Sequence, residues 1–196
     1  SDSKDRRWDQ NSKFRRGEYK IMKTRSLVLV GLFAAIICIF APFTVPVGPI
    51  PISLATFAIY LAAAVIGGKK GTAAVAVYIL IGAVGIPVFS GFGAGIGKIL
   101  GVTGGYIVGY IPCAYVAGTI IDRFQDKKIA YPIALILGTA VLYVFGTAWF
   151  MFQTGNSLYD SLIACVIPFL IGDAVKIAVA SVVSIKLRSY AYREIA

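Results

Sequence analysis

The chain has 196 residues, of which 58% are hydrophobic and only 14% are charged, and its mean hydropathy is +0.81. Soluble domains contain about 45–50% apolar and about 25% charged residues, so the composition excludes an ordinary soluble domain and indicates a single membrane-embedded domain. The net charge of +10 does not indicate nucleic-acid binding, because the basic residues lie between the apolar segments, where membrane proteins carry them.

The first 22 residues are polar and mixed in charge. They lack the apolar stretch of a cleavable signal peptide. We expect residues 1–22 to form a polar tail, part of which could be a remnant of cloning. We expect residues 23–196 to form one membrane domain.

Six apolar segments follow, separated by gaps rich in proline, glycine or charge. They cover residues 26–44, 53–66, 72–88, 98–121, 129–152 and 159–187. A helix needs roughly 20 apolar residues to cross a bilayer, so several segments are long enough, and the second and third are short. Backbone groups in lipid must be satisfied within the segment, which favours helices. The pattern predicts an all-α integral membrane protein with six transmembrane helices.

The basic residues predict the orientation. Seventeen of the nineteen Lys and Arg residues lie on one side, whereas the loops at residues 45–52 and 153–158 have none. The positive-inside rule therefore places both termini in the cytoplasm of a multi-pass protein of the cell membrane. Lys98 and Lys176 are the two exceptions.

The first apolar segment carries pairs of small residues four apart. These are Gly31 with Ala35 and Ala34 with Cys38. Such pairs let another helix approach closely. They indicate either internal packing or a docking surface for a partner membrane protein, and the sequence alone does not separate the two.

A proline-rich segment, FTVPVGPIPIS, covers residues 43–53. Its prolines prevent a helix and favour a stiff, extended chain. It could be a simple connector. It could equally be a lid over an outward-facing cavity, to which Phe43, Val45, Pro46 and Pro51 would contribute.

Glycines occur at every fourth position from 93 to 109 within residues 85–110. We expect Gly101, Gly105 and Gly109 to form a packing seam on a helix. Residues 91–97 are too glycine-dense for a helix, and their free N–H groups could contact a ligand. The candidate contacts here are Ser90, Gly91, Gly93, Lys98, Thr103 and Tyr106. The stretch is no P-loop, because Phe92 and Ile99 replace the required Gly and Ser/Thr.

Asp173 and Lys176 place a carboxylate and an ammonium in the last apolar segment. A charge inside a membrane helix costs roughly 2.5–3.5 kcal/mol on insertion scales, and the spacing of three puts both on one helical face. The pair either neutralises itself and fixes packing or forms a polar patch that binds a ligand. The chain has no histidine and only three scattered cysteines. We therefore expect no metal site, no catalytic residues and no enzyme.

These segments together resemble the BioY family, the biotin-binding S components of energy-coupling factor (ECF) transporters. The resemblance covers about residues 25–188. It rests on three stretches of sequence: PVGPIPISLATF, GIPVFSGFGAGIGKILGVTGGYIVGY and GDAVK. It implies a subunit that captures biotin from outside, without a cofactor or nucleic acid. Its partners would be a transmembrane coupling protein and two cytoplasmic ATPase subunits.

The resemblance also implies that Asp173 and Lys176 belong to the biotin pocket. The ureido group of biotin offers two N–H donors and one carbonyl acceptor, which a carboxylate and an ammonium can meet. Its carboxylate needs separate donors, for which Lys98 or N–H groups near Gly91 and Gly93 are candidates. The alternative is an autonomous secondary transporter in which Asp173 carries a coupling proton.

Overall fold

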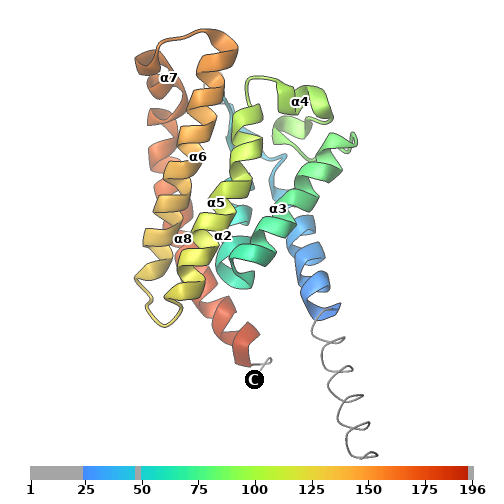
Figure 1. The fold of residues 1–196 in the computed structure, drawn as a ribbon, viewed down its shortest axis with the longest axis vertical. Helices are drawn as coiled ribbons and strands as arrows, with labels where there is room; N and C mark the ends of the chain where they lie inside the picture. Colours follow the sequence, from blue (N-terminus) through green and yellow to red (C-terminus); the bar gives the residue numbers. More distant parts are fainter. Residues whose placement is uncertain (1–23, 47–49, 194–196) are drawn as a thin grey trace, which may run out of the picture.

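The structure is a computed structural model that describes residues 24–46 and 50–193, and the predicted tail lies outside this range. The described chain is largely helical, with the long helices running side by side (Figure 1). In order, the elements are the N-terminal helix (Thr24–Phe40), β1 (Thr44–Val45), β2 (Ile52–Ser53), α2 (Ala55–Ile66), α3 (Gly68–Ala83), the 3-10 turn η1 (Ser90–Phe92), α4 (Ile96–Leu100), α5 (Gly104–Arg123), α6 (Ala130–Thr154), α7 (Leu158–Cys165) and α8 (Ile167–Arg193).

Within the described residues, three helices are long and apolar enough to cross a membrane. They are Gly104–Arg123, Ala130–Thr154 and Ile167–Ser189. The N-terminal helix and α2 are apolar but shorter. The predicted all-α class is confirmed, whereas six spans and cytoplasmic termini stay predictions.

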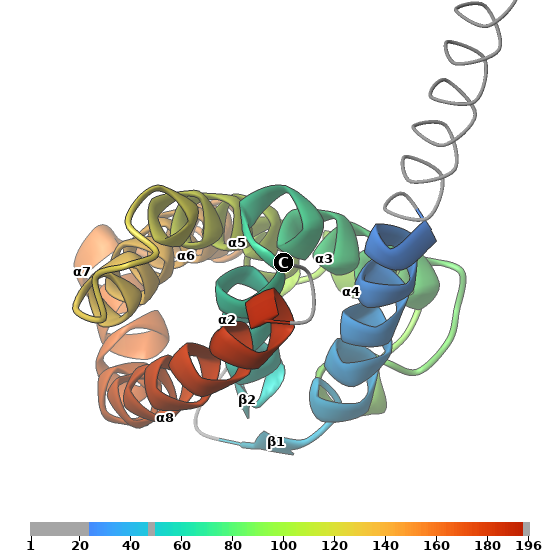
Figure 2. The ribbon, with the colours of Figure 1, turned by 90° about the horizontal axis from the view of Figure 1, so that it is seen from below.

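Helix α2 lies at the centre of the bundle, in contact with α3, α5 and α8 (Figure 2). Its buried residues are mostly small, and Ala58, Ala62 and Ala63 are completely buried. Small side chains let neighbouring backbones approach: a Cβ on Gly71 of α3 would lie 2.8 Å from Ala63 Cα. The bundle therefore packs through close backbone contact, as membrane helices commonly do.

The predicted glycine seam holds for part of its length. A Cβ on Gly105 would lie 2.8 Å from Phe145 O, and one on Gly109 would lie 3.0 Å from Leu142 Cδ1, so both glycines seat α6 against α5. Gly101 does not belong to this seam. It lies in an extended break between α4 and α5, and its carbonyl accepts a hydrogen bond from Trp149 Nε1 at 3.0 Å.

Two further predicted boundaries were wrong. The predicted gap at residues 67–71 is mostly helical, because only Gly67 (φ +86°) interrupts the helices and α3 begins at Gly68. The Gly68 N–H donates to Asp122 Oδ2 at 2.8 Å, which satisfies the helix start. The last apolar segment is divided at Val166 into α7 and α8, because Pro168 lacks the N–H that a continuous helix needs.

The described parts of the proline-rich segment are extended, as predicted. β1 and β2 pair antiparallel, with Thr44 opposite Ser53 and Val45 opposite Ile52. Residues 47–49 between them lie outside the described range. The pairing fixes Ser53 at the start of α2, facing α8.

Candidate ligand-binding site

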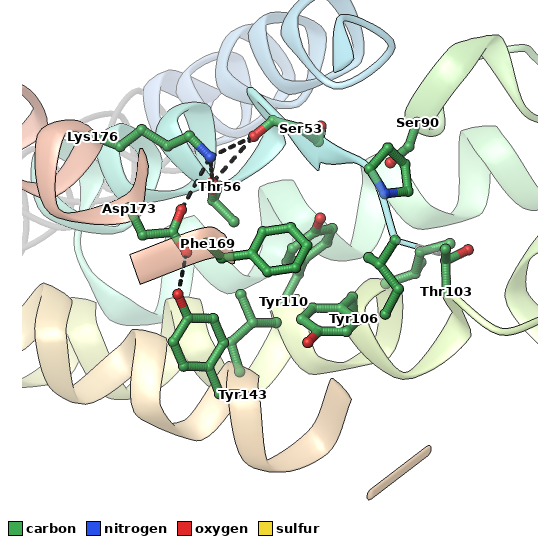
Figure 3. A pocket seen from close by; sticks show the side chains of 14 residues that line it. Ser53, Thr56, Ser90, Thr103, Tyr106, Tyr110, Tyr143, Phe169, Asp173 and Lys176 are labelled. Carbon is green, nitrogen blue, oxygen red and sulfur yellow. Dashed lines mark hydrogen bonds and ion pairs between the residues drawn. The ribbon is translucent and has the colours of Figure 1, made fainter. Parts of the chain in front are cut away.

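A cavity with an empty volume of about 460 Å³ lies among β2, α2, η1, α5, α6 and α8. This volume includes space that is open to solvent. Figure 3 shows Asp173 and Lys176 at one end, Ser90 and Thr103 at the other, and aromatic rings between them. The lining residues are Ile50, Pro51, Ser53, Thr56, Ser90, Thr103, Tyr106, Ile107, Tyr110, Leu142, Tyr143, Phe169, Asp173 and Lys176.

Asp173 and Lys176 form a buried ion pair on α8. Lys176 Nζ lies 3.0 Å from Asp173 Oδ1, and the two side chains are 11% and 6% exposed, respectively. The pairing agrees with the spacing of three. Charges so poorly solvated must be paired and hydrogen-bonded, because a lone buried charge costs several kcal/mol.

The start of α2 supplies the other partners of Lys176. Its ammonium donates to Ser53 O at 2.8 Å and to Thr56 Oγ1 at 3.0 Å. Ser53 is itself fixed, because its hydroxyl donates to Ala41 O and accepts the Ala55 N–H. All three hydrogens of Lys176 therefore have acceptors. The ammonium is held at a defined point in the cavity wall.

Tyr143 of α6 completes the polar end of the cavity. Its hydroxyl donates to Asp173 Oδ2 at 2.7 Å, so each oxygen of the Asp173 carboxylate accepts one hydrogen bond. A carboxylate oxygen has room for a further donor. The Asp173 carboxylate can therefore accept a hydrogen bond from a ligand N–H group, whereas Lys176 can donate to a ligand C=O group only if that group replaces one of its present acceptors.

Aromatic rings form the middle of the cavity. The Tyr106 and Phe169 rings lie 6.2 Å apart, and the Tyr106 hydroxyl donates to Cys165 O at 2.7 Å, which ties α5 to α7. The Tyr106 ring covers Gly146 of α6, where a side chain would collide with it. Rings held in this way give a rigid apolar wall.

The structure brings five of the predicted contact residues together in this cavity: Ser90, Thr103, Tyr106, Asp173 and Lys176. Gly91, Gly93 and Lys98 do not line it. The prediction of free N–H groups was wrong for Gly91 and Gly95, which donate to Pro42 O and Gly82 O. The Lys98 side chain lies over Gly93, whose added Cβ would be 3.0 Å from Lys98 Cε.

Of the four predicted lid residues, only Pro51 lines the cavity. Val45 pairs with Ile52 in the hairpin and is 62% exposed. Phe43 is exposed and packs its ring against Phe92, with centroids 6.0 Å apart. Pro46 is exposed as well. These three residues lie outside the cavity wall.

The N-terminal helix presents part of the predicted partner surface. Gly31 and Ala35 are exposed, and nothing lies within 4 Å of a Cβ added to Gly31. Cys38 is half-buried. Ala34 is only 1% exposed and belongs to the core, so it is unavailable to a partner. The interface with a partner stays a prediction for the exposed pair.

Sequence reasoning missed eight lining residues: Ile50, Ser53, Thr56, Ile107, Tyr110, Leu142, Tyr143 and Phe169. Helical spacing could have found two of them, because Tyr110 follows Tyr106 by four and Phe169 precedes Asp173 by four. Ser53 and Thr56 gave no such signal. Their role depends on how the hairpin brings α2 against α8.

Comparisons with known proteins identify relatives of this chain. The profile of the BioY family matches residues 11–193. "Biotin transporter BioY" of Thermotoga maritima is 34% identical over 164 residues, which cover 84% of this chain and 96% of the relative. "Probable biotin transporter BioY" of Pyrococcus horikoshii is 36% identical over 85% of this chain and 98% of the relative.

A solved structure has the same fold. The "S-component for biotin from an ECF-type ABC transporter" matches with a TM-score of 0.79 and 28% identity, over 86% of this chain and 93% of the other. The family match covers more than nine-tenths of the sequence, and both relatives are matched over nearly their whole length. The chain therefore belongs to the BioY family.

Proposed function

We infer that this chain is the biotin-capturing S component of an ECF-type uptake transporter. The observation that carries the inference is the buried Asp173–Lys176 pair in an aromatic-walled cavity of a BioY-family fold. The relatives and the solved structure reported above are biotin transporters or their S component. The family is one of transporters rather than enzymes.

We propose that the ureido group of biotin binds at the Asp173–Lys176 end. Its N–H groups would donate to Asp173, and its carbonyl would accept from Lys176. Since Lys176 already uses its three hydrogens, the carbonyl would replace the Thr56 hydroxyl as an acceptor. The exchange costs little, because a neutral hydroxyl is the weakest of the three acceptors.

The rest of biotin would lie along the aromatic wall. The fused rings and the aliphatic chain would contact Tyr106, Tyr110 and Phe169, which line the middle of the cavity. The carboxylate would then reach the Ser90 and Thr103 hydroxyls at the other end. Lys98 lies nearby over Gly93, and its ammonium has no acidic partner among the described residues, so it would supply long-range attraction.

Energy for uptake would come from other subunits. The glycine-rich stretch lacks the P-loop pattern, so we propose that a transmembrane coupling protein and two cytoplasmic ATPases drive release. Gly31 and Ala35 on the exposed face of the N-terminal helix would contact the coupling protein. We propose six spans in the cell membrane with both termini in the cytoplasm, which agrees with the basic residues.

The secondary-transporter alternative gains no support. Asp173 accepts from both Lys176 and Tyr143, which suits a fixed counter-ion better than a residue that takes up and releases a proton. Binding measurements separate the two functions, because an S component needs no coupling ion to form its site.

Isothermal titration calorimetry of the purified chain with biotin tests the proposal. We expect one site, with the same affinity with and without sodium. Lys176→Ala should weaken binding by at least 2 kcal/mol, since hydrogen bonds to charged groups contribute about 1.5–3 kcal/mol. Lys186→Ala, on an exposed part of the same helix, is the matched control and should bind normally. Full affinity of a folded Lys176→Ala variant would contradict the site assignment.

A further inference from the structure

A second, basic crevice lies at the opposite end of the bundle from α4. It lies where the α2–α3 junction meets the ends of α5 and α8, and its empty volume is about 1350 Å³. The side chains that matter for binding are Lys69, Lys70, Asp122 and Arg188, together with the apolar Leu29, Val65, Ile66 and Tyr115. Biotin binding as proposed above uses none of these residues.

Asp122 does not cancel the charge of the lysines, because both its oxygens are already bonded. Oδ1 lies 2.6 Å from Arg188 Nη2, and Oδ2 accepts the Gly68 N–H at 2.8 Å. Arg188 is only 5% exposed and also donates to Ala64 O at 2.9 Å. This ion pair forms a neutral, rigid floor that ties α2, α3, α5 and α8 together.

Lys69 and Lys70 remain uncompensated in the crevice. Both are exposed in the first turn of α3, and neither has an acidic partner among the described residues. The charged lining residues therefore sum to two positive charges: three cations and one anion. A helix start adds to this positive potential. The crevice therefore favours an anionic group.

The apolar wall indicates which kind of anion fits. Leu29, Val65, Ile66 and Tyr115 lie beside the cations, and Tyr115 is 49% exposed. A free phosphate would leave this wall unused, whereas a phospholipid would lay an acyl chain along it. The α2–α3 junction, which lines the crevice, lies at the ends of the apolar helices (Figure 1), where basic pockets bind anionic headgroups.

We propose that this crevice binds the headgroup phosphate of an anionic phospholipid, with Lys69 and Lys70 as the phosphate ligands. Each basic side chain near an anionic surface contributes about a fivefold factor in binding. Loss of both lysine charges should therefore weaken binding about 25-fold. Binding at this end of the bundle is independent of biotin at the other end.

Native mass spectrometry of the full chain in nonionic detergent, titrated with dioctanoyl phosphatidylglycerol, tests the proposal. The test variant is Lys69→Gln/Lys70→Gln. The matched control is Lys127→Gln/Lys186→Gln, which removes two exposed charges outside the crevice. We expect about 25-fold weaker binding for the first, less than threefold for the second, and retention by Lys69→Arg/Lys70→Arg. An equal loss in the control would overturn the proposal.

A second measurement uses only the unmodified chain and so does not depend on the variants folding. Phosphatidylglycerol should bind at least tenfold tighter than dioctanoyl phosphatidylcholine. Equal affinities would refute a charge-selective site. Complete displacement of the lipid by an equal concentration of inorganic phosphate would show a free-phosphate site and refute the lipid. Biotin titration of each variant is a separate readout, so failure here leaves the proposed function intact.

Discussion

Replacing Lys176 with Met removes the charge at the centre of the site and nearly preserves the size of the side chain. Three hydrogen bonds are lost, to Ser53 O, Thr56 Oγ1 and Asp173 Oδ1. At about 0.6 kcal/mol each, the average in a membrane protein, they amount to about 2 kcal/mol. The carboxylate of Asp173, 6% exposed, also loses its counter-ion. Breaking a buried pair costs about 3–5 kcal/mol, so we expect a loss of about 3 kcal/mol.

For a chain of this length, about 3 kcal/mol corresponds to a Tm lower by roughly 6–12 °C. Thermal unfolding in detergent without biotin measures it. Lys186→Met is the matched control on the same helix, and its Tm should change by no more than about 2 °C, as expected for an exposed residue. Asp173→Asn/Lys176→Met removes both charges and should recover at least half of the loss.

Two outcomes would refute this reasoning about the pair. One is a Lys176→Met variant that unfolds at the temperature of Lys186→Met. The other is a double variant that is no more stable than Lys176→Met. Either would mean that the ion pair of Asp173 and Lys176 does not hold α8 against the start of α2.

Further predictions concern packing and ligand recognition. Gly118→Ala should destabilise the fold by about 2 kcal/mol or more, because its Cβ would lie 2.6 Å from the Gly68 nitrogen, which is backbone and cannot turn aside. Gly31→Ala, with open space around it, should be neutral or stabilising in the same thermal unfolding assay. Tyr143→Phe removes the bond to Asp173 Oδ2 and should weaken biotin binding about tenfold or more by calorimetry. Unchanged affinity would exclude Tyr143 as a positioning residue.

Much of the helical fold could be predicted from the apolar segments and from the proline, glycine and charged residues that separate them. The extended strands β1 and β2 and the long helices α5 and α6 agree with the predicted segments. The errors occurred where tertiary contacts decide a boundary. Gly68 starts α3 because Asp122, 54 residues away, accepts its N–H, and the α4–α5 break is held by Trp149 through the Gly101 carbonyl. Partners so distant leave no local pattern.

The candidate site was partly predictable for the same reason. A charge pair in an apolar helix is conspicuous, so Asp173 and Lys176 were found from sequence. Ser53 and Tyr143 were not, because a serine beside prolines and a tyrosine in an apolar segment are ordinary residues. Only the packing of the hairpin and α6 against α8 makes them partners of the pair.

Identification of the ligand that the chain retains tests the central claim most directly. The chain would be expressed in cells grown with biotin, purified in detergent, and analysed by native mass spectrometry beside its Lys176→Ala variant. The account predicts one biotin per chain in the wild type and little or none in the variant. A different ligand at the same occupancy, or biotin retained equally by both, would contradict it.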